Sequence, residues 1–257
     1  EGPDQSESHV IVLAPGDGKL NEIGKVSGLG KGETIRSVRF IGETGYVVTF
    51  EQTDPLYTID LSNPQSPRVV GELKILGYSA YLHPIGDGFL VGVGQDATED
   101  GRTTGAQVAL FDVRDPAAPK RIAQATLPNG FTDAEWDHHA FLYWADTNLV
   151  AIPVSLYDGT NDFNGVVGFT VDPDASTVTE LGRIEHPGVS ETTGEIVLPV
   201  EGDGAAASEP VAPDVFVYTP PITRTVVIGD KVWTLSENGI GNSDLATLGQ
   251  TSFIPFS

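Results

Sequence analysis

The feature that most constrains the fold is a unit of four short apolar runs that recurs along the chain. The runs are rich in Val, Ile, Phe, Tyr and Thr, and they are separated by Gly, Asp, Asn and Pro. In the first copy they occupy residues 37–42, 45–50, 56–61 and 68–73. β-Branched and aromatic residues favour extended chain, and the separating residues favour tight turns. Each unit therefore predicts four antiparallel strands joined by hairpins.

The same unit returns three more times before the end of the sequence. Its runs occupy residues 80–86, 88–94, 107–113 and 120–125, then 140–144, 148–154, 165–171 and 179–184, and finally 223–229, 231–235, 241–245 and 250–256. No stretch has the apolar spacing of a long amphipathic helix, and only residues 243–248 are expected to be briefly helical. Repeated four-stranded antiparallel units are typical of the blades of a β-propeller. We predict an all-β chain with blades at residues 34–74, 78–126, 137–185 and 222–257.

Three segments lie outside these blades. Residues 1–9 read as a polar tail, and residues 10–30 read as a half blade with only the third and fourth strands. Residues 186–221 form an acidic insertion, in which residues 195–200 and 214–218 are predicted to pair as an added hairpin. No further strands complete the half blade. This indicates a piece of a larger propeller, because an open array leaves surfaces between blades uncovered.

The third runs of the first two units end in the same pattern, Asp-x-x-x-Pro-x-x-Pro. It spans residues 60–67 and 112–119. Asp or Asn before Pro starts a tight turn through bonds from its side chain to the backbone. Proline is tolerated on an outermost strand because no neighbouring strand needs its missing donor. The pattern is therefore interpreted as a structural turn and not as a site.

Charge and cysteine content limit the partners and the chemistry. The chain has 14 Lys and Arg against 36 Asp and Glu, a net charge of −22, and neither Cys nor Met. Such a charge repels nucleic acid and anionic membranes, which excludes both as partners. The lack of cysteine excludes disulfides, thiolate metal sites and cysteine nucleophiles. No apolar run approaches the roughly 18 residues of a membrane helix, so no membrane insertion is expected.

A set of short motifs runs through residues 30–257, excluding the acidic insertion. These are Val38-Arg-Phe-Ile-Gly, Tyr46-Val-Val-Thr-Phe, Asp54-Pro-Leu, Gly71-Glu-Leu-Lys-Ile-Leu-Gly-Tyr-Ser, Tyr81-Leu-His-Pro, Gly101-Arg-Thr-Thr-Gly, Leu110-Phe-Asp-Val, Asp137-His-His-Ala-Phe-Leu and Ile222-Thr-Arg-Thr-Val-Val-Ile-Gly-Asp. As a set they resemble the bacterial and archaeal secreted proteins with a C-terminal β-propeller domain distantly related to WD repeats. The resemblance implies a propeller fold and a secreted or cell-surface location, and it implies no particular reaction.

An acidic loop in the second unit has the spacing of a calcium loop. Asp96, Thr98 and Asp100 supply oxygen at alternate positions and Gly101 follows, although Gln107 stands where a bidentate acid is expected. The other interpretation is an acidic hairpin loop closed by Gly101. A second, weaker version places Asp158 and Asp162, with Thr160 and Asn164, at alternate positions. Ca²⁺ is the cofactor that these two loops would take.

The run Glu135-Trp-Asp-His-His stands at the predicted start of an innermost strand of the third blade. Innermost strands line the central channel of a propeller, and strand alternation would place Asp137 and His139 on one face and His138 on the other. An Asp–His pair there can bind a metal or act as a general base. The other interpretation is a hydrogen-bonded network that fixes neighbouring blades, which is the commoner role of such groups.

Three further residues lie on predicted inner strands. His83 near the end of its strand either meets the region of Asp137 across the channel or is a hydrogen-bonded strand-end histidine. Arg36 and Arg39 are scarce positive charges that can hold an anion. Ion pairing with acids is the role expected of them in so acidic a chain.

Two functions from different classes follow. The first is a secreted or cell-surface, non-catalytic binding or scaffold propeller whose ligand is a protein or a cell-envelope component. The second is a metal-dependent enzyme, similar to hydrolases or lactonases with a propeller fold, with a channel site around Asp137 and His138. The first is favoured because the sequence has no serine-hydrolase elbow, phosphate loop or dinucleotide fingerprint.

Overall fold

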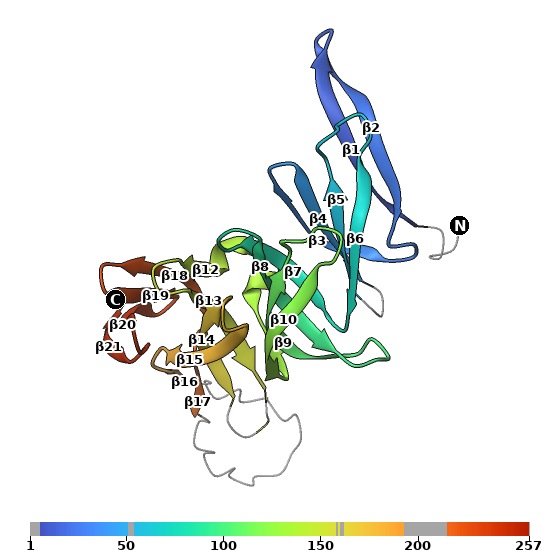
Figure 1. Ribbon diagram of the computed structural model, residues 1–257. Helices are drawn as coiled ribbons and strands as arrows, with labels where there is room; N and C mark the ends of the chain where they lie inside the picture. The colour runs from blue at the N-terminus through green and yellow to red at the C-terminus, as the bar shows by residue number, and fades with distance from the viewer. Residues whose placement is uncertain (1–5, 51–53, 158, 160–161, 193–214, 257) are drawn as a thin grey trace, which may run out of the picture.

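The computed structural model describes residues 6–50, 54–157, 159, 162–192 and 215–256. In this part of the chain the regular elements are antiparallel strands, apart from two short 3₁₀ helices (Figure 1). The prediction of an all-β propeller with four-stranded antiparallel blades is confirmed. No helix among the described residues is long and apolar enough to cross a membrane.

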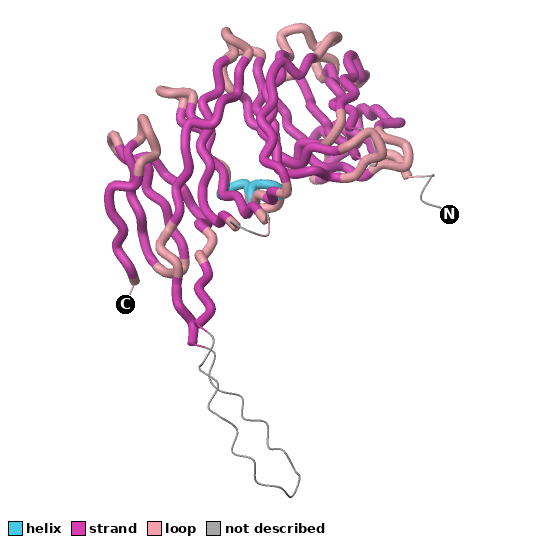
Figure 2. Tube along the Cα trace, turned by 90° about the horizontal axis from the view of Figure 1, so that it is seen from below, coloured by secondary structure: helices cyan, strands magenta, loops and turns pink. Residues whose placement is uncertain are grey.

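Four sheets follow one another along the chain. Three of them have four strands paired in chain order: β3 (Thr34–Ile41), β4 (Thr44–Phe50), β5 (Asp54–Asp60) and β6 (Arg68–Ile75); β7 (Tyr78–Pro84), β8 (Phe89–Ala97), β9 (Thr103–Asp112) and β10 (Lys120–Pro128); and β18 (Ile222–Ile228), β19 (Lys231–Ser236), β20 (Gly239–Asp244) and β21 (Gln250–Pro255). Figure 2 shows the sheets side by side in an arc, with the short helical segment on its concave side.

The sheet between β10 and β18 departs from this order. It contains β11 (Gly130–Phe131), β12 (Leu142–Trp144), β13 (Leu149–Leu156), β14 (Phe163–Asp172) and β15 (Thr177–Glu185). Both β11 and β12 pair with β13, so the innermost strand is split in two. The 3₁₀ helices Asp133–Glu135 and His138–Ala140 fill the gap. The prediction of a continuous inner strand beginning at Glu135 is therefore wrong.

Capping residues explain why the chain turns at this point. The side chain of Thr132 accepts a hydrogen bond from the N–H of Ala134, and that of Asp137 accepts one from the N–H of His139. Thr and Asp are good N-cap residues because a short side-chain oxygen reaches the free N–H groups of the first turn. The brief helix expected at 243–248 is also wrong. β20 ends at Asp244, whose carboxylate accepts from the N–H groups of Ala246 and Thr247 in a turn.

Two hairpins stand beside the four sheets. β1 (Ser8–Gly16) and β2 (Lys19–Leu29) pair, and their Val10 and Val26 pack against the buried residues Val47 and Ile59. β16 (Val189–Thr192) pairs with β17 (Val215–Tyr218). The insertion therefore does contain a hairpin, but its first strand lies earlier than predicted. Residues 195–200 lie outside the described residues.

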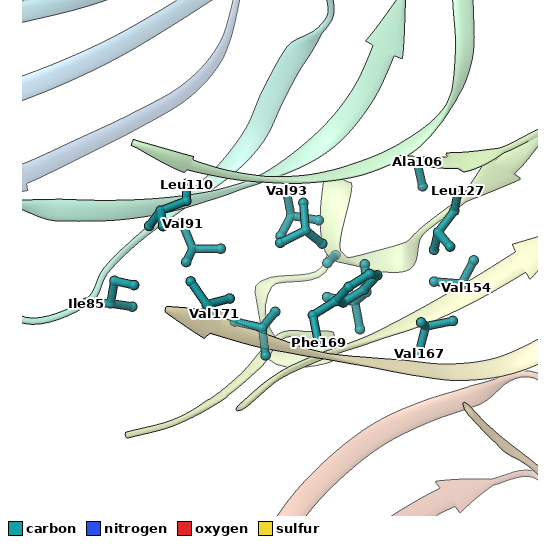
Figure 3. Packing of buried hydrophobic residues seen from close by; sticks show 14 residues of the cluster. Ile85, Val91, Val93, Ala106, Leu110, Leu127, Val154, Val167, Phe169 and Val171 are labelled. Atoms are coloured by element: carbon teal, nitrogen blue, oxygen red, sulfur yellow. The ribbon is translucent and has the colours of Figure 1, made fainter. Parts of the chain in front are cut away.

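The core lies between neighbouring sheets. The largest cluster joins the second and third sheets, where Val91, Val93 and Leu110 face Val167 and Phe169 (Figure 3). Phe169 is 1% exposed. Full burial of such a side chain contributes roughly 1.5–3 kcal/mol. Apolar packing of sheet on sheet thus holds the sheets at the spacing that brings their inner strands together.

A repeated contact at the outer edge reinforces this packing. The turn at 60–67 lies against Gly24 of β2, and the equivalent turn at 112–119 lies against Gly71 of β6. A Cβ atom would lie 2.2 Å from the carbonyl oxygen of Pro64 at the first glycine and 2.1 Å from that of Pro116 at the second. The Asp-x-x-x-Pro-x-x-Pro turns are therefore packing elements between sheets.

Candidate functional site

A cleft of about 230 Å³ opens where the inner strands β3 and β7 meet the second 3₁₀ helix. Its polar lining includes Arg36, Arg39, Tyr81 and His138, and its apolar lining includes Ile35, Val38, Ala80 and Leu82. Residues of three successive sheets thus meet at one place, which we call the β3–β7 cleft.

Hydrogen bonds across the sheets position one arginine of the cleft. The Nε of Arg39 donates to the carbonyl oxygen of Leu82 at 3.0 Å, and its Nη2 donates to the Tyr81 hydroxyl at 3.3 Å. The Ser37 hydroxyl donates to the carbonyl oxygen of Ser79 at 2.7 Å. Ser37 and Arg39 are two residues apart, so both side chains face β7. β3 is therefore fixed on β7 by backbone carbonyls as well as by packing.

The second arginine lies on aromatic rings. A β-bulge between Ile35 and Ser37 breaks the alternation of β3 at Arg36. The Arg36 guanidinium carbon lies 4.7 Å from the ring centroid of Tyr78 and 5.5 Å from that of Phe50. A cation over an aromatic face is attracted by the negative charge of the ring face. This contact holds Arg36 at the cleft without a carboxylate.

A partly buried hydrogen-bonded group adjoins the Tyr78 ring that Arg36 contacts. The Tyr78 hydroxyl donates to Oε2 of Glu135 at 2.9 Å, and Gln95 donates to the other oxygen of Glu135. Burial, and then the negative charge of Glu135, raises the pKa of Tyr78 far above its ordinary value. Tyr78 therefore stays protonated and remains a neutral platform for the guanidinium.

Ion pairing was the role predicted for both arginines, and the acids that the structure describes do not supply it. Within the described part of the chain, no Asp or Glu lies within ion-pair distance of Arg36 or Arg39. Five other arginines there do pair with an acid, namely Arg68, Arg102, Arg114, Arg183 and Arg224. Of the two roles considered for Arg36 and Arg39, the geometry favours holding an anion.

Aromatic residues form the wall of the cleft toward the third sheet. The ring centroid of Tyr81 lies 4.8 Å from that of His138 and 4.9 Å from that of Phe141. The Tyr81 hydroxyl also bonds Nδ1 of His83 at 3.1 Å. Burial, and then the charge of Arg39, lowers the pKa of His83. His83 therefore belongs to this aromatic wall, and its recorded partners do not include Asp137.

The Asp137 region is built differently from the predicted channel pair. Asp137 accepts from the N–H of His139 at 3.0 Å and from its Nδ1 at 3.2 Å, and Arg224 of β18 lies 2.9 Å from its other oxygen. These bonds, with the backbone N–H of His139 first, hold the pKa of Asp137 below its usual range. His138 instead stacks on Tyr81. The structure therefore joins Asp137 to His139 and Arg224, and places His138 in the β3–β7 cleft.

The residues of the first predicted calcium loop have separate protein partners. Asp96 accepts from the Thr126 hydroxyl at 3.3 Å, and Asp100 pairs with Arg102 at 3.3 Å. The Thr98 hydroxyl bonds both the N–H and the carbonyl oxygen of Arg102, each at 3.3 Å. To bind Ca²⁺ at this loop, the two carboxylates would have to leave these partners. Calcium binding here stays a prediction.

The second predicted calcium loop is only partly visible. Asp158 lies outside the described residues, and Asp162 accepts from the N–H of Gly159 at 3.4 Å. Over the part of the chain that the structure describes, no group of three or more His, Cys, Asp or Glu stands close enough to hold a metal ion. This loop, too, remains a prediction.

Sequence reasoning named Arg36, Arg39, His83 and His138 but missed the two tyrosines. Tyr78 and Tyr81 are the residues that hold the arginines, and each makes its contact across a boundary between sheets. A β-bulge between Ser79 and Tyr81 also breaks the alternation of β7 between them. The two tyrosines in the sequence of β7 were the available signal. The sequences of β3 and β7 do not show, however, that packing of the two sheets brings these tyrosines to the arginines.

Comparison with known proteins places the chain among relatives that are longer than it is. It is 44% identical over 150 residues to an uncharacterized protein of Methanocaldococcus jannaschii, and 41% identical over 150 residues to an uncharacterized protein of Archaeoglobus fulgidus. Each match covers 58% of this chain and 23% of the relative. The chain thus spans under a quarter of the length of these relatives.

Solved structures match the chain at low sequence identity. The Nup133 β-propeller domain of Vanderwaltozyma polyspora matches with a TM-score of 0.41 and 12% identity, over 89% of this chain and 65% of that one. A mutant apocarotenoid oxygenase of Synechocystis matches with a TM-score of 0.36 and 14% identity, over 83% of this chain and 46% of that one. A family described as the beta propeller domain matches residues 1–248. The chain therefore belongs to the beta propeller domain family.

Proposed function

We propose that this chain is a non-catalytic binding or scaffold propeller that works outside the cell, secreted or at the cell surface. Its ligand is a protein or a cell-envelope component, and it binds at the β3–β7 cleft on the concave side of the arc. The observation that carries the proposal is the arginine pair. Arg36 and Arg39 are held by rings and a backbone carbonyl, with no acid among the described residues within ion-pair distance.

The cleft is built for binding more than for proton transfer. A general base must lie within hydrogen-bond reach of the proton that it takes, and a second group usually orients it. In the cleft His138 stacks on Tyr81, and the His83 ring bonds the Tyr81 hydroxyl. Arginine and tyrosine, by contrast, are the side chains that most often anchor a bound partner.

A cross-linking experiment tests the binding site. A photo-reactive phenylalanine analogue replaces Val38 in the cleft, and the same analogue replaces Val69 on the outer strand β6 as the matched control. Both positions are partly exposed. After illumination with the envelope fraction of the source organism, we expect a discrete cross-linked species with the Val38 variant and not with the Val69 variant. Cross-linking only at Val69 would place the ligand elsewhere and overturn the site.

The location outside the cell rests on composition and on the sequence resemblance. A net charge of −22 keeps a protein soluble in a salt-rich setting, and the lack of Cys and Met avoids oxidation. Fractionation of the source cells with an antibody against the chain tests this part. The protein is expected in the medium or on protease-accessible surfaces of intact cells. Recovery only inside protease-protected cells would contradict it.

The metal-dependent alternative has one observation in its favour, the contact between Asp137 and His139 on the concave side. However, the Arg224 guanidinium already pairs with the Asp137 carboxylate, which a metal ion would need as a ligand. Elemental analysis of the purified chain separates the two functions. We expect no stoichiometric metal after dialysis. A stoichiometric cation that Asp137→Asn removes would favour the enzyme.

A further inference from the structure

We infer that the β3–β7 cleft binds a carboxylate group carried on a small apolar body. The inference rests on the proposed binding function and deepens it by naming the class of ligand. The shared chemistry is one negative charge attached to a few carbon atoms. Two sources can supply it: a free organic acid, or the C-terminal residue of a peptide.

The charge argument comes first. The chain has a net charge of −22, and among the described residues seven Lys and Arg side chains pair with an acid. Arg36 and Arg39 do not, within the described residues, although they lie in one cleft. Because both arginines border the cleft, an anion bound there is attracted by two positive charges. The cleft is thus a local positive site in an acidic molecule, and it favours an anionic ligand.

The donor groups favour a planar oxyanion. A guanidinium carries five N–H groups in a fixed plane and matches a carboxylate with two parallel hydrogen bonds. Arg39 uses its Nε and one bond from Nη2 within the protein, which leaves Nη1 and the rest of Nη2 for a ligand. The structure records no hydrogen bond from the Arg36 guanidinium to a described residue, because this group lies on the Tyr78 ring. Both arginines line the cleft, and both keep N–H groups that no described residue accepts.

The rest of the lining favours an apolar body beside the charge. Ile35, Val38 and Leu82 border the cleft, and the His138 ring closes one side. The volume of about 230 Å³ lies below the ~300–1,000 Å³ of pockets for drug-sized ligands, so the body has only a few carbon atoms. A doubly charged phosphate has no apolar part to contact this surface. The acidic molecule as a whole also repels phosphate more strongly than it repels a singly charged carboxylate. A monocarboxylate satisfies both halves of the lining.

An NMR titration tests the inference directly. The chain is labelled with ¹⁵N-arginine, and the Nε–H signals of Arg36 and Arg39 are followed while hexanoate is added. We expect saturable shifts of these two signals. Three other compounds serve as controls: neutral hexanamide tests the charge, acetate tests the apolar body, and inorganic phosphate tests the class of anion. Each is expected to bind at least about tenfold more weakly than hexanoate, since a hydrogen bond to a charged group is the strongest single contact.

Variants locate the site. Arg36→Gln is expected to weaken hexanoate binding about tenfold or more, and Arg36→Lys to restore it only in part because lysine lacks the planar pair of donors. Arg102→Gln is the matched control, because it removes one positive charge from an exposed hairpin loop and leaves the cleft intact. A melting curve of each variant shows whether it is folded. If Arg36→Gln unfolds, Tyr81→Phe, which keeps the ring and removes one bond to Arg39, takes its place.

Two peptide probes separate the sources. A short peptide ending in leucine with a free C-terminus is compared with the same peptide carrying a C-terminal amide. Binding of the free peptide and not of the amide indicates a peptide C-terminus. Binding of hexanoate alone indicates a free acid. Equal binding of hexanoate and hexanamide, or tighter binding of phosphate, would overturn the inference.

The same data separate this inference from the proposed function. If the Val38 variant cross-links to an envelope component while hexanoate causes no shift, the carboxylate inference falls and the binding function stands. If hexanoate shifts Arg36 and Arg39 while Val38 does not cross-link, the cleft binds a small acid. The proposed protein or envelope ligand then falls.

Discussion

His186 lies 2% exposed beneath the last sheet, directly after β15. Its Nδ1 lies 2.6 Å from the Ser236 hydroxyl and its Nε2 lies 2.8 Å from the Thr234 hydroxyl. The Phe253 ring covers it, with centroids 4.8 Å apart. The sequence placed this residue at the start of an insertion, and nothing in its neighbours indicated that a strand about 50 residues later would receive it. A single residue thus ties the third sheet to the fourth.

We expect His186 to make stability depend on pH. Burial lowers the pKa of His186 in the folded protein, whereas the unfolded chain keeps a value of about 6.5. As the pH falls below about 6.5, the unfolded chain takes up the proton first, so the free energy of unfolding decreases until the folded pKa is reached. Urea unfolding at several pH values between about 8 and 5 measures the slope. His186→Gln should reduce it.

Part of this slope comes from a second histidine. His83 also has a lowered pKa, from burial and then from Arg39, so it contributes with the same sign and part of the slope persists in His186→Gln. At about pH 8 the loss of two side-chain hydrogen bonds should itself lower stability by about 2 kcal/mol. An unchanged slope in His186→Gln would contradict the assignment.

At the scale of elements, one contact occurs twice: an Asp-x-x-x-Pro-x-x-Pro turn lies against a glycine of a neighbouring strand. Gly71 of β6 faces the turn at 112–119, and a Cβ there would lie 2.1 Å from a backbone oxygen that cannot rotate away. We expect Gly71→Ala to lower the free energy of unfolding by roughly 1–3 kcal/mol, the usual cost of overpacking. Urea unfolding measures it.

Gly249→Ala is the matched control for this prediction. Its Cβ would meet only the Thr247 side-chain oxygen, at 3.3 Å, and that side chain can move. We expect it to cost clearly less than Gly71→Ala. Equal losses in the two variants would mean that the contact between turn and glycine does not hold the sheets together.

The acidic loop between β8 and β9 closes through its own bonds. The N–H of Gly101 donates to the Thr98 carbonyl at 2.9 Å, and the N–H of Thr98 donates to the Arg102 carbonyl at 2.9 Å. Because these bonds involve no carboxylate, we expect a chelator to leave the melting temperature unchanged. A rise in melting temperature with added Ca²⁺ that Asp96→Ala abolishes would instead establish a bound ion, since a ligand stabilises only the state that binds it.

The strands could be predicted from sequence because each is specified locally. Alternating Val, Ile, Phe and Tyr between Gly, Asn, Asp and Pro determines a hairpin without reference to the rest of the chain. The segment 132–140 could not be predicted in this way, since it is too short for its apolar spacing to distinguish a helix from a strand. Its available signal was Thr132 followed by Glu135, the spacing of a capping box.

The sequence indicated some of the residues that line the cleft, but not that they lie together. Arg36 and Arg39 were expected on an inner strand, where the structure places them. Among the described residues these arginines contact the rings of Tyr78 and Tyr81, which come from the next sheet, and not the acids expected as their partners. Such contacts depend on how far each sheet is rotated about the axis. That rotation results from the packing of whole faces, which a local pattern does not encode.

At the scale of the whole molecule, the uncovered faces at the ends of the arc matter most. Sheets inside the arc bury apolar side chains on both faces. The last sheet instead leaves Val226 49%, Ile228 63% and Leu235 37% exposed. These residues border a cavity of about 300 Å³ whose lining is mostly apolar, with Trp233 and Ile240. A continuous apolar surface of this kind favours association with another surface.

We therefore expect the 257-residue chain to associate with itself, and the association to increase with salt. Apolar contact favours it and the net charge of −22 opposes it, and salt screens the charge over about 10 Å at 0.1 M. Light scattering after size-exclusion chromatography at low and high salt measures the mass. Ile228→Lys should shift the chain toward the monomer, whereas Tyr157→Lys adds the same charge at an exposed position away from this sheet and should have a smaller effect. If both variants behave alike, charge and not the uncovered face of the last sheet controls the association.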